Sequence, residues 1–181
     1  GISGTTLLNA LPTIAEHPLP YVFGFVGLLA GVGYSASLFP FHFWTPDTFE
    51  GAPTSVAGFL SVTPKVGAVF ALTQVLRELP SSELAAPTTL ALVSVASMTY
   101  GNLLALRQKS PIRLLAYSTV AQTGHFLIGA LMVARSQLSV EALVIFGTAY
   151  AAMNLGAFAL LPGREKSLQQ WGGLGRTQPV I

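Results

Sequence analysis

Long apolar runs recur along the whole chain and constrain its fold more than any other feature. Five of them reach about 20 residues, the length that crosses a bilayer as a helix. Lipid supplies no hydrogen bonds, so a spanning segment must satisfy its own backbone, and a helix does this. We therefore expect five transmembrane helices, at Pro20–Phe41, Ser55–Leu76, Ala85–Leu106, Ile112–Val133 and Leu138–Leu161.

Composition supports the same fold class. Of 181 residues, 51% are hydrophobic and only 9% are charged, whereas a soluble domain carries about 25% charged residues. We therefore predict an all-α polytopic membrane protein. The absence of cysteine excludes disulfides, thiolate metal sites and iron–sulfur ligation. No glycine-rich phosphate loop follows a strand pattern, and no basic stripe interleaved with aromatics indicates nucleic-acid binding.

The chain divides into a transmembrane bundle with a short segment on either side. We expect residues 1–19 to be a loop or the tail of a preceding helix, 20–161 to form the five-helix bundle, and 162–181 to be an interfacial loop.

Basic residues between spans orient the bundle, because cytoplasmic loops carry an excess of them. Six of them fall on one side and only Arg77 and Arg135 on the other; the six are Arg107, Lys109, Arg113, Arg164, Lys166 and Arg176. We interpret the Arg107–Arg113 charges as solvated orientation signals.

Lys65 is the residue that most needs a functional explanation. It lies about 15 Å along its span, near the predicted midplane. A charged amine at that depth costs at least about 2.5–3.5 kcal/mol on insertion scales, and such groups usually handle ions or protons. The alternative is a lysine with a structural role, which either extends to the membrane interface or forms a structural pair with another group. Its central depth makes extension to the interface difficult. Pro64 precedes Lys65 and should leave the Leu60 carbonyl without its helical donor, creating a small polar pocket where the helix kinks.

His125 is a second candidate for proton transfer. It lies within LAYSTVAQTGHFLIGAL, and side chains upstream on the same helix are candidate hydrogen-bond partners: Tyr117, Ser118, Thr119 and Gln122. A histidine can relay protons near neutral pH. A lone histidine is also a common structural residue, and both interpretations remain open.

Small residues concentrate in the first span. Pro20–Phe41 contains four glycines and two serines before Pro40. Such residues allow close helix packing, but they also permit a broken helix that lines a polar cavity.

After this span, HFWTPDTFEGAP combines aromatics, prolines and acids, which predicts a rigid structural loop in which Asp47 caps the following turn. In the last span, Asn154 is expected to form a structural hydrogen bond.

Four motifs together resemble the antiporter-like membrane subunits of respiratory complex I, and most closely the N-type subunit. They are FPFHFWTPDTFEGAP, FLSVTPKVGAVFAL, GNLLALRQKSPIRLLAYSTVAQTGH and MNLGAFAL, and the resemblance runs from about Gly24 to Leu161. It implies a larger bundle of inverted repeats with broken helices, of which this chain would be an internal fragment.

The resemblance also implies roles for particular residues. Lys65 matches a lysine of the family's central proton-transfer axis, and its acid partner would come from sequence outside this chain or from a neighbouring subunit. The family usually has another lysine where YSASLFPFH places Ser35. Because Ser35 cannot carry a proton charge, it could act only through water. Tyr150 and Asn154 stand where long-chain relatives have a histidine and a lysine.

By this resemblance, the chain is expected to translocate protons within NADH-quinone oxidoreductase. Flavin, iron–sulfur clusters and quinone would be bound by partner subunits, with no cofactor site in this chain. Its partners would be other membrane subunits, lipid and protons, in an energy-transducing membrane: bacterial inner, mitochondrial inner or thylakoid. Two alternatives remain: a subunit of a multisubunit cation/proton antiporter, and a structural subunit that does not conduct.

Overall fold

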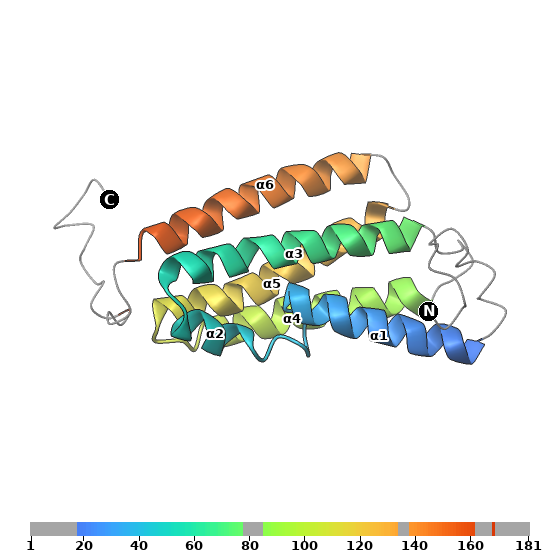
Figure 1. The fold of residues 1–181 in the computed structure, drawn as a ribbon, viewed down its shortest axis with the longest axis horizontal. Helices are drawn as coiled ribbons and strands as arrows, with labels where there is room; N and C mark the ends of the chain where they lie inside the picture. The colour runs from blue at the N-terminus through green and yellow to red at the C-terminus, as the bar shows by residue number, and fades with distance from the viewer. Residues whose placement is uncertain (1–17, 78–84, 134–137, 162–167, 169–181) are drawn as a thin grey trace.

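Every regular element in the described part of the chain is helical. The computed structural model describes residues 18–77, 85–133, 138–161 and 168, so the predictions for 1–17 and for most of 162–181 lie outside the described residues. Figure 1 shows the long helices running side by side along the longest axis, with the short α2 near the start of α3. The helices are α1 (Pro18–Ala36), α2 (Thr45–Gly51), α3 (Thr54–Arg77), α4 (Ala85–Ala105), α5 (Pro111–Val133) and α6 (Leu138–Ala159).

The long helices match the five predicted spans, with boundaries that differ by a few residues. By length and composition, three described helices could cross a membrane: Thr54–Arg77, Ala86–Ala105 and Ser139–Ala159. The apolar stretch Val22–Ala36 of α1 is shorter, and α5 is not among the three. The expected number of five spans is therefore supported directly for three helices.

The predicted span Pro20–Phe41 is wrong at its end. Helix α1 stops at Ala36, because Ser37 takes a left-handed backbone with φ of 61° and the chain turns before α2. A left-handed residue cannot continue a right-handed helix. This interruption agrees with the expectation of a broken helix. Close packing is found here only at Gly33, where an added Cβ would lie 2.7 Å from the Phe41 ring; Gly24, Gly27 and Gly31 have no described neighbour within 4 Å.

Helix α3 occupies the middle of the bundle. It contacts α1, α2, α5 and α6, while α4 packs mainly on α5. The α4–α5 contact depends on glycine: a Cβ on Gly124 would lie 2.8 Å from the Ser94 carbonyl oxygen, and one on Gly101 would lie 2.6 Å from the Ala121 nitrogen. Such close backbone approach is how membrane helices associate without a hydrophobic driving force. The main core joins α3, α5 and α6 through buried side chains that include Val69, Leu72, Phe126, Leu127 and Tyr150.

Candidate functional site

The Lys65 side chain lies inside the protein. Its exposed fraction is 0%, so the amine does not extend to solvent. Nζ donates a hydrogen bond of 3.3 Å to the carbonyl oxygen of Leu60. That oxygen is available because Pro64 has no N–H to offer it. The predicted pairing of a free carbonyl with the amine is therefore present, and α3 continues through Pro64 as one helix.

Two aromatic rings face the same amine. Nζ lies 5.2 Å from the centroid of Phe49 and 5.7 Å from that of Trp44. A cation within about 6 Å of a ring is attracted by the negative face of the π-system, and the attraction strengthens when water is excluded. Phe49 is fully buried, whereas Trp44 is half-buried. The surroundings thus supply one carbonyl and two rings to a protonated amine, together with an apolar environment suited to a neutral one.

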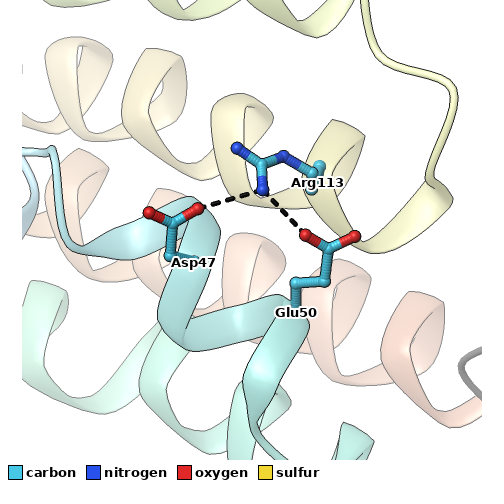
Figure 2. Close-up of polar contacts among 3 residues, drawn as sticks. All are labelled: Asp47, Glu50 and Arg113. Atoms are coloured by element: carbon cyan, nitrogen blue, oxygen red, sulfur yellow. Dashed lines mark hydrogen bonds and ion pairs between the residues drawn. The ribbon is translucent and has the colours of Figure 1, made fainter.

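An ion cluster holds α2, which carries Phe49, against α5. Figure 2 shows the Arg113 guanidinium between two carboxylates of α2: its Nη1 lies 3.0 Å from Asp47 Oδ1 and 2.7 Å from Glu50 Oε2. Two interpretations from the sequence are therefore corrected. Arg113 is not simply a solvated charge, because its position at the start of α5 brings it to α2. Asp47 does not cap a turn: the N-cap of α2 is Trp44, without a side-chain cap, and the recorded bond of Asp47 is to Arg113.

The connection between α1 and α2 is fixed by polar contacts. Thr45 Oγ1 donates to Ser37 Oγ at 2.7 Å, and the Phe39 backbone N–H donates to Ser97 Oγ of α4 at 2.9 Å. The Trp44 indole N–H donates to the Tyr34 carbonyl at 2.9 Å, which orients the ring over Lys65. These bonds connect the segment to α1 and α4; the rigidity that the HFWTPDTFEGAP pattern predicts stays a prediction.

His42 lies in the same connection and is 7% exposed. Its ring stacks on Phe39 at 5.7 Å and meets the edge of Tyr100 at 4.8 Å. Among the described residues, its buried Nδ1 has no hydrogen-bond partner. Burial lowers the pKa of His42, because removal from water disfavours the charged imidazolium. Sequence reasoning did not single out this residue.

Tyr150 links α6 to α3 one turn before Lys65. Its hydroxyl donates to the Ser61 carbonyl oxygen at 2.8 Å, and its ring is fully buried against Phe126. Asn154 donates from Nδ2 to the Tyr150 carbonyl at 3.2 Å, a contact within its own helix. The tyrosine hydroxyl, rather than the asparagine amide, therefore connects this helix to the lysine helix.

Ser35 and His125 are not joined to Lys65 by any recorded contact. Ser35 is exposed and lines a groove of about 380 Å³ between α1 and α3, whose wall includes Pro64. His125 is also exposed, and its Nδ1 lies 3.1 Å from the Ala121 carbonyl oxygen of its own helix. The expected side-chain partners of His125 are therefore wrong, because the helix presents this ring outward.

Three features were missed by the sequence interpretation. Trp44 and Phe49 face the amine, although their pattern had indicated only a rigid structural loop. The aromatic density of that loop was the available signal. Glu141 lies in the first turn of α6, within the predicted span Leu138–Leu161, and the sequence interpretation did not consider this carboxylate beside Lys65. Its side chain is exposed, and no ion pair between it and Lys65 is recorded among the described residues.

Comparison with curated proteins gives many relatives with one name. The chain is 40% identical to NADH-quinone oxidoreductase subunit N of Rubrobacter xylanophilus, with all of this chain and 39% of the relative covered. It is also 40% identical to the protein of the same name from a Mycobacterium species, with the same coverage. The chain thus spans about two-fifths of the length of these relatives.

Solved structures give matching folds. A chain of respiratory complex I from Thermus thermophilus, with bound aureothin, superposes with a TM-score of 0.72 at 37% identity, over 90% of this chain and 36% of that one. A chain of an archaeal membrane-bound sulfane sulfur reductase gives a TM-score of 0.73 at 25% identity, over 87% of this chain and 34% of that one.

The transmembrane family described as NADH:quinone oxidoreductase/Mrp antiporter matches residues 1–181. The chain therefore belongs to the NADH:quinone oxidoreductase/Mrp antiporter transmembrane family and is a multi-pass membrane protein, as its motifs had indicated.

Proposed function

We propose that this chain is part of a proton-translocating membrane subunit of NADH-quinone oxidoreductase, and that Lys65 loads and releases the proton. The family and the names of the curated relatives support the complex. The observation that carries the residue assignment is an amine fully buried in an apolar helix bundle, whose one recorded hydrogen-bond acceptor among the described residues is the Leu60 carbonyl oxygen. A structural spacer would gain nothing from such a group, because apolar replacements of buried charges are often neutral or stabilising.

The surroundings of Lys65 support a role in which its charge changes. Burial favours the neutral amine, whereas the Leu60 oxygen and the two ring faces favour the ammonium. Because these effects oppose one another, a charge placed nearby by another part of the complex can decide which form is populated. Protonation and release would then follow the charge of the neighbours, while Leu60 holds the nitrogen in one position.

Ser35 and His125 are assigned only indirect roles in this proposal. Ser35 stands at a family lysine position and would act only through water in the groove beside Pro64. His125 faces outward, so a relay through it would require contacts from outside the described residues. We assign electron transfer, with flavin, iron–sulfur clusters and quinone, to partner subunits, and the chain to an energy-transducing membrane, bacterial by the source of its relatives.

Substitution of Lys65 tests the proposal in the assembled complex. Lys65→Met and Lys65→Ala should lower quinone reductase activity and the proton gradient while the complex still assembles. Lys109→Ala is the matched control, because Lys109 is exposed in the α4–α5 connection. Full coupled turnover in both Lys65 variants would contradict proton transfer at this residue and would favour the non-conducting subunit.

An antiporter subunit is the second candidate, because the matching family description covers Mrp antiporters as well. Purification of the full-length protein separates the two. Copurification of iron–sulfur and flavin subunits supports the oxidoreductase, whereas sodium-dependent proton exchange without those subunits supports the antiporter.

A further inference from the structure

A short segment after α1 covers the Lys65 amine with aromatic surface. Trp44, at the N-cap of α2, and Phe49, within α2, place their ring centroids 5.7 and 5.2 Å from Nζ. Both rings therefore come from one segment, whereas the Leu60 acceptor belongs to the lysine's own helix.

The position of this segment depends on two sets of contacts. Phe49 packs edge-to-face on Phe158 of α6 at 5.8 Å, in a buried cluster that also contains Ile112 of α5. On the other side of α2, Arg113 bonds Asp47 and Glu50 (Figure 2). The apolar contacts fix the ring, and the ion cluster ties the helix that carries the ring to α5.

We propose that Trp44 and Phe49 are positioning residues that form an aromatic clamp on the protonated Lys65 amine, kept closed by the Arg113–Asp47–Glu50 cluster. The inference rests on the proposed proton transfer at Lys65 and adds the groups that set how readily the amine keeps its proton. The ring faces attract the ammonium but not the neutral amine. A closed clamp favours the protonated form, and an opened one favours release.

Other titratable groups surround α3, but their recorded contacts lie elsewhere. Tyr150 of α6 bonds the Ser61 carbonyl, and the ring contacts of His42 are with Phe39 and Tyr100. His125 and Glu141 are exposed on α5 and α6. Asp47, Glu50 and Arg113 bond one another, and within the described residues none of these groups has a recorded ion pair with Nζ. The rings therefore provide the nearest recorded favourable contacts besides Leu60.

Replacement of the Phe49 ring tests the clamp in the full-length subunit within the assembled complex. Phe49→Leu keeps apolar bulk but removes the π face, so the alkaline limb of the pH profile of proton pumping should move to lower pH. The expected displacement is about half a pH unit or more, from a desolvated cation–π contact. Phe126→Leu is the matched control: Phe126 is equally buried, and its recorded ring contacts are with Phe146 and Tyr150. Equal profiles in the two variants would overturn the clamp.

Fluorinated phenylalanine at position 49 keeps the inference testable if Phe49→Leu reduces assembly. Fluorination weakens the negative ring face with little change in shape, so the pH profile should move progressively with fluorine number. A profile that does not respond in an assembled complex contradicts the inference.

The ion cluster forms the second arm of the test. Arg113→Gln should move the pH profile in the same direction as Phe49→Leu, and Arg113→Lys should recover part of it. Arg107→Gln is the control, because Arg107 is exposed and has no recorded ion pair in the described part of the chain. A wild-type profile in Arg113→Gln would show that the ion cluster does not keep the clamp closed.

The failure of the clamp and the failure of the proposed function are distinguishable. If Lys65→Met abolishes pumping while the ring variants keep the wild-type profile, only the clamp fails. If Lys65→Met pumps normally, the proposed function fails.

Discussion

The amine of Lys65 donates to the carbonyl oxygen of Leu60, the same oxygen that Pro64 leaves without its helical donor. The proline creates the acceptor and the next residue uses it. The Lys65 amine thus replaces the missing backbone donor and has a buried polar contact without any acidic partner from the described chain.

Pro64→Ala should stabilise the helix and impair the site together. An alanine N–H would bond the Leu60 oxygen, removing a defect that costs about 3 kcal/mol in a helix interior. The Lys65 amine would then share or lose its acceptor, so proton pumping should fall while subunit content is maintained or rises. Pro87→Ala is the control, because Pro87 lies in the first turn of α4, where no helical bond is lost. Unchanged pumping in Pro64→Ala would show that the free carbonyl has no role in the site.

Tyr150→Phe should destabilise the α3–α6 contact by about 1 kcal/mol. The substitution leaves the Ser61 carbonyl without the hydroxyl donor at 2.8 Å, while the buried ring still packs on Phe126. Thermal unfolding of the purified subunit measures the effect. Tyr34→Phe is the matched change at an exposed ring, and equal midpoints for the two variants would contradict a stabilising role for the Tyr150 hydroxyl.

Gly124→Ala should separate α4 from α5 and reduce assembly. Its Cβ would lie 2.8 Å from the Ser94 carbonyl oxygen and 3.1 Å from the Met98 nitrogen, both backbone atoms that cannot move aside alone. Gly156→Ala is the control, since nothing described lies within 4 Å of its added Cβ and alanine favours helix over glycine. Subunit content in membranes distinguishes them: only Gly124→Ala should lower it.

His42 should make the connection between α1 and α2 sensitive to acid. Its pKa in the fold is lower than the ordinary value of 6.5, so the unfolded state binds more protons as the pH falls through 6.5. Stability is therefore fully present above about 6.5 and declines as the pH falls toward the lowered pKa. His42→Gln should remove this decline, measured as the difference in unfolding midpoint between about pH 7.5 and pH 5. His125→Gln, at an exposed histidine, should leave the difference in place; a decline that persists unchanged in His42→Gln excludes His42 as its source.

The sequence alone determined the local features of this protein. Apolar runs of spanning length predict helices because lipid requires a self-satisfied backbone, and all five long helices are present. The relation among Leu60, Pro64 and Lys65 was also predictable, because it follows from helix geometry over a single turn. The motifs were specific enough to identify the family to which the chain belongs.

Only the tertiary structure decided what surrounds the amine. Arg113 reaches Asp47 and Glu50 across separations of 66 and 63 residues, and Tyr150 reaches Ser61 across 89. Such pairings depend on how helices rotate against one another. That rotation is weakly encoded when both the lipid-facing and the buried side of a helix are apolar. For the same reason His125 was a candidate in sequence but points outward in the fold, whereas Trp44 and Phe49 were assigned to a loop but cover Lys65.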